Sequence, residues 1–184
     1  MRITESEVYV MRALRADEIE VRVGQIYDKK VSMLLYKNAR VDMAILDETY
    51  GEFGWQCDYK EIKGNMYCGI AVADPNGNWV WKWDCGTESN TEKEKGEASD
   101  AFKRAGFRWG IGRELYTGPR IYLDVATDEV AKYKYKLHDS CELNGIYVSY
   151  IETEEINGKL VITKLELSQK TYGKSGVIYG WRKK

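Results

Sequence analysis

The chain has 184 residues, 43% of them hydrophobic and 31% charged, as expected for a globular protein with a sizeable core. Its formal net charge of −1 argues against a strongly basic nucleic-acid-binding protein judged on totals. No apolar run approaches the ~20 residues of a membrane span, and the start MRITESE lacks the apolar segment of a signal peptide. We therefore expect a cytoplasmic protein that does not contact membranes.

The first fifty residues predict helix, strand and helix in that order. A short helix is expected over about Ala16–Val23, and the apolar run VSMLLY predicts a strand. Asn38 is a typical helix N-cap residue, so a second helix is expected to run from there to about Tyr50. The buried side of that second helix is predicted to contain Val41, Ala44 and Ile45.

From Phe53 onward the hydrophobic period changes from helical to two, which indicates strands. The apolar residues of the first strand are Phe53, Trp55, Cys57 and Tyr59. A second strand, Met66–Ala73, is followed by the turn sequence DPNG and by a third strand, Trp79–Cys85. These segments predict a three-stranded antiparallel meander.

Three tryptophans, Trp79, Trp81 and Trp83, alternate along the third strand and so share one face. We expect this face to pack on the following helix, with Trp81 opposite Val72 or Ile70. The other interpretation is a surface on which single-stranded bases stack.

A long amphipathic helix is predicted over Lys95–Leu115. Arg104 and Arg108 lie one turn apart and form a cationic ridge beside its apolar stripe, while Lys103 lies further round the helix. The ridge is either a solvated face or a grip for phosphates. The apolar stripe consists of Ala98, Ala101, Phe102, Ala105 and Trp109.

The remaining sequence predicts further strands in 143–184: Leu143–Thr153, Lys159–Gln169 after an Asn157-Gly158 turn, and Val177–Trp181. With only two prolines and no Ser/Gly-rich linker, we expect one domain over 1–184. The expected fold class is α+β, with an antiparallel meander packed on a long helix (a β-β-β-α core), an additional N-terminal helix and C-terminal strands. The role of the basic C-terminal segment 159–184 stays open.

Few residues suit catalysis. The four cysteines form no CxxC pair, which favours buried, reduced thiols over a metal site with the single histidine, His138. A metal-dependent nuclease is the sharpest enzymatic alternative, because Glu61-Ile62-Lys63 is an E-x-K pattern with Asp58 and Asp47 upstream. Such short patterns are common by chance, so we predict no catalytic residue, metal or cofactor.

Two segments carry a more specific pattern, YKNARVDMAILDETYGEFGWQ and, after the meander and a polar loop, EKGEASDAFKRAGFRWGIGREL. In combination they resemble the Rad-fifty-two superfamily of single-strand annealing proteins, in particular its phage and prophage members of the Sak type. The resemblance covers about Leu14–Tyr122.

The resemblance implies a non-enzymatic protein of homologous recombination and repair in a bacterial host cytoplasm, which binds single-stranded DNA and anneals complementary strands without ATP. It implies a homo-oligomer, either a ring or a filament, and a single-strand-binding protein or exonuclease as partner. By the same resemblance Arg40, Lys103 and Arg104 line an inner DNA groove, with Arg108 secondary and with Lys93 or Lys95 in an outer site. A module that binds single-stranded nucleic acid without annealing remains the alternative.

Overall fold

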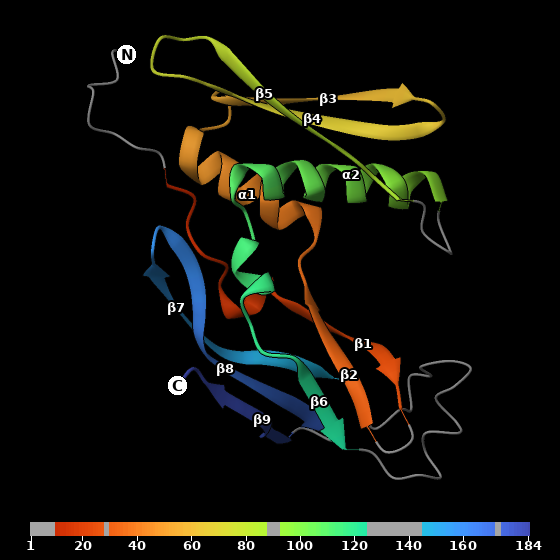
Figure 1. Ribbon diagram of the computed structural model, residues 1–184, viewed down its shortest axis with the longest axis vertical. Helices are drawn as coiled ribbons and strands as arrows, with labels where there is room; N and C mark the ends of the chain where they lie inside the picture. The colour runs from red at the N-terminus through yellow and green to blue at the C-terminus, as the bar shows by residue number, and fades with distance from the viewer. Residues whose placement is uncertain (1–9, 28–29, 88–92, 125–144, 172–173) are drawn as a thin grey trace. The chain divides into compact units, whose positions relative to one another are not determined.

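The computed structural model describes residues 10–27, 30–87, 93–124, 145–171 and 174–184 (Figure 1). Within these residues the chain forms two compact units. The first unit comprises residues 10–13 and 38–112, and the second comprises residues 14–37 and 113–184. The prediction of a single annealing domain over 1–184 stays a prediction.

The first unit consists of a three-stranded antiparallel sheet in the order β3-β4-β5 and two helices. Helix α2 runs beneath the sheet, and α1 lies beside α2 (Figure 1). In chain order the elements are α1 (Ala39–Tyr50), β3 (Trp55–Ile62), β4 (Asn65–Ala73), β5 (Trp79–Cys85) and α2 (Lys93–Trp109).

Helix α1 begins and ends where the sequence predicts. The Asn38 side chain accepts hydrogen bonds from the backbone N–H groups of Arg40 and Val41, at 2.9 and 3.3 Å, and so caps the first turn. The helix ends at Gly51, whose φ of 76° suits glycine. Its buried residues include the expected Val41 and Ile45, whereas Ala44 is half-buried.

The meander is confirmed, but its register differs from the prediction. A tight turn at Lys63-Gly64, with φ of 55° and 75°, joins β3 to β4. The Asp74–Gly77 turn joins β4 to β5, and Trp81 then pairs with Ala71. The expected partners Val72 and Ile70 are wrong by one residue, which places them on the opposite face from Trp81.

The long helix ends earlier than predicted, at Trp109 instead of Leu115. Gly110 has a φ of 110° and the N–H of Ile111 donates to the carbonyl of Gly106, so the helix closes in a left-handed turn. Residues Arg113–Tyr116 form a separate 3-10 turn, η2. The expected apolar stripe is present, since Ala101, Phe102 and Ala105 are fully buried and Ala98 and Trp109 are half-buried.

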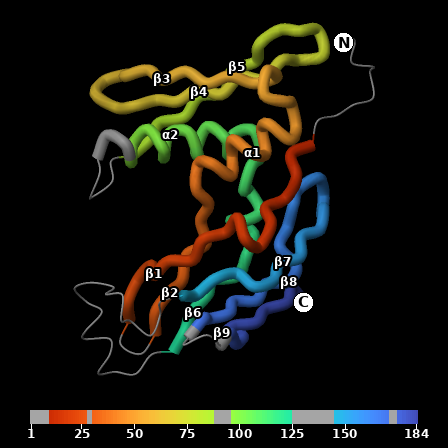
Figure 2. The backbone as a smooth tube through the Cα atoms, turned by 180° about the vertical axis from the view of Figure 1, so that it is seen from behind, coloured from red at the N-terminus to blue at the C-terminus, as the bar shows by residue number. Residues whose placement is uncertain are grey.

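The second unit holds two further antiparallel sheets, with the orders β1-β2-β6 and β7-β8-β9. In Figure 2, β2 lies between β1 and β6. The Asn157-Gly158 turn is confirmed, with φ of 52° and 71°. The strands are β1 (Glu20–Ile26), β2 (Lys30–Tyr36), β6 (Ile121–Asp124), β7 (Ile146–Ile156), β8 (Lys159–Thr171) and β9 (Lys174–Arg182).

The predicted helix over Ala16–Val23 is wrong. Only a 3-10 turn, η1 (Ala16–Glu18), forms there, and the chain then enters β1. The sequence EVRV alternates as a strand does, and pairing with β2 supplies the hydrogen bonds that an isolated short helix would lack. The expected strand start at Leu143 lies outside the described residues.

The fold class is α+β with antiparallel sheets, as predicted. In the part of the chain that the structure describes, no helix is long and apolar enough to cross a membrane.

Candidate nucleic-acid interface

The cationic ridge of α2 is anchored on one carboxylate of β5. Arg108 Nε donates a hydrogen bond to Asp84 Oδ2 at 2.9 Å, and Arg104 Nε lies 3.6 Å from Asp84 Oδ1. The side chains of Arg104 and Arg108 are 52% and 54% exposed, whereas that of Asp84 is 19% exposed. Asp84 therefore orients two guanidinium groups that still face solvent.

The pKa of Asp84 is lowered from its ordinary value, although partial burial, the largest single influence, favours the neutral acid. The backbone N–H of Cys85 donates to Asp84 Oδ1 at 2.8 Å, and the charges of Arg108 and Arg104 add to this stabilisation of the carboxylate. Asp84 is thus a fixed negative charge at neutral pH. A phosphate that binds the two arginines competes with it.

Lys103 lies on a different flank of α2 from the two arginines. It is one turn from Gly106, the residue at which α2 meets α1 so closely that a Cβ atom would lie 2.3 Å from Asp42 Oδ1. Lys103 Nζ is 4.0 Å from Asp100 on its own helix. The structure therefore brings Arg104 and Arg108 together and separates Lys103 from them.

Arg40 occupies the first turn of α1 and is exposed. The buried residues Ile45 and Leu46 follow it by five and six positions, so at ~100° per residue Arg40 lies on the outer side of the helix. The expectation that Arg40 meets Lys103 across a groove stays a prediction. Lys93 and Lys95 fall in the first turn of α2, but their side chains lie outside what the structure describes.

The tryptophans of β5 do not pack on α2, which corrects the favoured interpretation of the stripe. Helix α2 contacts the other face of the sheet: Trp55 packs edge-on against Phe102 at 6.0 Å between ring centroids. From β5 it is Lys82, alternating with the tryptophans, whose Nζ lies 3.8 Å from the centre of the Trp109 ring. We call the opposite face, which carries Trp79, Trp81 and Trp83, the aromatic face.

Lys82 and Asp84 occupy the helix side of β5, where the tryptophans were expected. Besides covering the Trp109 ring, Lys82 Nζ donates to the carbonyl of Arg108 at 3.2 Å, where the last turn of α2 leaves carbonyl groups without helical partners. The sequence WVWKWDC already shows that Lys82 and Asp84 alternate with the tryptophans and so share the opposite face. On that face they pair with the Arg108 carbonyl and with the arginines of α2. The sequence interpretation missed both residues.

Each tryptophan of the aromatic face lies opposite a small residue of the central strand, β4. Trp83, Trp81 and Trp79 pair with Gly69, Ala71 and Ala73, respectively. The Trp81 and Trp83 rings stack, with centroids 5.5 Å apart and planes inclined by 22°. Lys60 Nζ, from β3, lies 4.4 Å from the centre of the Trp83 ring.

The geometry does not assemble the metal site of the nuclease alternative. Asp58 pairs with Gly69 and belongs to the aromatic face, whereas Glu61 is three residues further along β3 and points to the opposite face. Lys63 lies in the tight turn after the strand. Among the described residues no group of three or more His, Cys, Asp or Glu side chains could hold a metal ion.

The described cysteines carry free thiols. Burial raises the pKa of the Cys68 thiol to about 12, so it stays protonated at neutral pH, and the expectation of a buried thiol is confirmed there. The expectation is wrong for Cys57, which is exposed. His138 and Cys141 lie outside the described residues.

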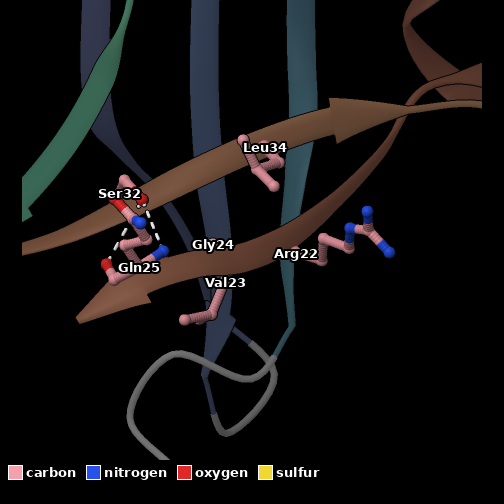
Figure 3. Close-up of a pocket in the computed structure, with 6 residues that line it drawn as sticks. All are labelled: Arg22, Val23, Gly24, Gln25, Ser32 and Leu34. Carbon is pink, nitrogen blue, oxygen red and sulfur yellow. Dashed lines mark hydrogen bonds between the residues drawn. The ribbon is translucent and has the colours of Figure 1, made fainter. Parts of the chain in front are cut away.

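A shallow hollow of about 490 Å³ opens on the β1-β2 hairpin of the second unit (Figure 3). Ser32 Oγ accepts from the backbone N–H of Gln25 at 2.7 Å and donates to the carbonyl of Gln25 at 3.2 Å. These bonds hold the Ser32 hydroxyl against the Gln25 backbone, and they do not form a nucleophile and base pair. Its lining residues are Arg22, Val23, Gly24, Gln25, Ser32 and Leu34.

No protein-family model matches the sequence, and no curated protein does either. The likeness to the annealing superfamily therefore rests on the two sequence segments that carry it.

Proposed function

We propose that this protein binds single-stranded DNA through the sugar-phosphate backbone and anneals complementary strands without ATP. The observation that carries the proposal is the pair Arg104 and Arg108, half-exposed, one helical turn apart and oriented by Asp84. Cations on a rigid helix can hold phosphates and leave the Watson–Crick edges of the bases free, which annealing requires.

We further propose that β3, β4, β5 and α2 correspond to the β-β-β-α core of the annealing superfamily, which the two sequence segments resemble. Lys103 and Arg40 are then additional phosphate contacts, Lys103 on the α1 side of α2 and Arg40 on the outer side of α1. The proposal includes no catalytic residue, metal or cofactor.

A protomer with a net charge of −1 holds a single strand weakly, because its 29 acidic residues cancel the charge of its 28 lysines and arginines and leave no net attraction for phosphates. Repetition of the same cations around a homo-oligomer, ring or filament, raises the affinity through multivalency. We propose this form of assembly in the cytoplasm of a bacterial host, with a single-strand-binding protein or an exonuclease as partner.

The test is the rate at which two complementary, fluorescently labelled oligonucleotides form duplex with and without the protein, in the absence of ATP. Acceleration by the wild type, its loss in the Arg104→Ala, Arg108→Ala double variant and its retention in Arg120→Ala, which removes an exposed arginine of the second unit, are expected. Tight single-strand binding without acceleration would instead identify a protective binding module. Cleavage that needs Mg²⁺ and disappears in Lys63→Ala would identify a nuclease.

A further inference from the structure

The aromatic face is an exposed apolar surface on the side of the sheet opposite to α2. Trp79 and Trp81 are 43% and 37% exposed, although tryptophan is highly buried on average in folded proteins. Contiguous apolar surface that is exposed in a folded protein is typical of interaction sites. We propose that this face binds the bases of single-stranded nucleic acid by stacking.

The rings are already arranged for a stacking ligand. Trp83 lies so close over Gly69 that a Cβ atom there would be 2.5 Å from the indole, and Trp81 is stacked on Trp83. A ring held by the strand beneath it loses little conformational freedom when a planar base joins the stack. Base-aromatic stacking also tolerates any base, because every base has a π-face.

The polar groups beside the rings favour nucleic acid over a second copy of the chain. Lys60, whose ammonium covers Trp83, is 57% exposed and pairs with Asp58 at 3.6 Å between Nζ and Oδ2. A protein docked over this face would bury that ion pair and lose its solvation. A nucleic acid strand places phosphates within reach of Lys60, and it leaves the pair open to water.

This site is distinct from the ridge on α2, because the sheet lies between them. Lys82 and Asp84 of β5 face α2, and the tryptophans that alternate with them face away. The stretch of nucleic acid that Arg104 and Arg108 hold is thus different from the stretch whose bases stack on Trp81. The inference rests on the proposed function for its choice of ligand class, and it adds a second site that recognises bases instead of phosphates.

The test compares a fluorescein-labelled oligothymidine with an abasic oligonucleotide of the same length, which has the same phosphates and no bases. Anisotropy titrations of the wild type are expected to give at least about 5-fold tighter binding of oligothymidine, the lower end for one stacked base. The Trp79→Ala, Trp81→Ala double variant should lose this preference and bind both probes equally. Phe53→Ala, which removes a 94% exposed aromatic residue outside the aromatic face, should keep it.

A variant that keeps an aromatic ring distinguishes the loss of base stacking from the loss of the fold. Trp81→Phe is expected to retain most of the preference for oligothymidine. Equal affinity of the wild type for the two probes would overturn the stacking site while leaving the phosphate grip intact. A drop in the oligomeric mass of the double variant, with its preference unchanged, would assign the face to a second copy and also overturn the inference.

Failure of the proposed function has a different signature. If the wild type binds neither probe, both the phosphate grip and the stacking site are wrong. If the Arg104→Ala, Arg108→Ala variant weakens both probes by the same factor and keeps the preference between them, the two sites are independent, as inferred.

Discussion

The six-membered ring of Trp83 lies against the backbone of Gly69, its cross-strand partner on β4. A side chain at residue 69 would have to displace the ring, because a Cβ atom would come within 2.5 Å of it. This contact fixes the end of the Trp81-Trp83 stack and so determines how the aromatic face is presented.

Gly69→Ala is therefore expected to lower the free energy of unfolding by about 1–3 kcal/mol, the usual cost of overpacking. Urea unfolding monitored by tryptophan fluorescence measures this change. Gly180→Ala is the matched control, since a Cβ atom at that strand position meets nothing within 4 Å. Equal stability of the two variants would show that the packing of the Trp83 ring does not require glycine at residue 69.

Asn38→Ala should destabilise the first unit by about 1 kcal/mol, because the side chain accepts hydrogen bonds from the backbone N–H groups of Arg40 and Val41. Chemical unfolding measures the loss. Asn38→Asp keeps an acceptor at the N-cap and should restore the stability. If Asn38→Asp is as unstable as Asn38→Ala, capping is not what the residue contributes.

Asp84→Asn is expected to lower stability by about 1 kcal/mol at pH 7, after allowance for the exposed arginine side chains. The pKa of Asp84 in the folded protein lies below its ordinary value of 3.8, so the ionised carboxylate stabilises the fold above that pH. This contribution disappears as the pH falls through the folded-state pKa. The difference between wild type and variant should accordingly shrink below about pH 4.

The control for Asp84→Asn is Asp124→Asn, which alters an ion pair with Lys30 in which Asp124 is 87% exposed. That variant should differ little from the wild type at any pH. A gap between wild type and Asp84→Asn that stays constant from pH 7 to pH 3 would contradict the ionic account.

The sequence carried enough information for the order and type of most elements. Asn38, the DPNG turn and the Asn157-Gly158 turn are local signals, and each begins or ends an element where the pattern predicts. The Ala16–Val23 segment failed because strand pairing with β2, a non-local interaction, decides its structure. The end of α2 was missed because Trp109 is followed by Gly110 in a left-handed conformation, which allows a turn without demanding one.

The candidate site was predicted only in part. Helical spacing is enough to predict that Arg104 and Arg108 lie side by side. The carboxylate that orients them belongs to Asp84, 20 or more residues earlier in the chain, and this spacing does not reveal it. The sequence of β4 could not predict which face of the sheet the helix covers, and hence on which side the tryptophans lie. Its residues Ile70 and Ala71 point to opposite faces but are both fully buried, so the strand shows no alternation. The polar residues Lys82 and Asp84 decide which face of β5 the helix covers.

Light scattering with and without single-stranded DNA tests the proposed assembly. We expect a particle of several protomers, since the sheet β3-β4-β5 has two edge strands and an assembled ring or filament protects such edges. A monomer under both conditions would contradict the multivalent binding on which the proposed affinity depends.

The salt dependence of single-strand binding tests the central proposal most directly. Each phosphate neutralised by an arginine contributes about 0.7 to the slope of log affinity against log salt concentration. The Arg104→Ala, Arg108→Ala variant should therefore have a slope lower than that of the wild type by about 1.4 per protomer engaged, while Arg120→Ala leaves the slope unchanged. A slope that is the same in the wild type and the double variant would contradict the assignment of Arg104 and Arg108 as the phosphate grip.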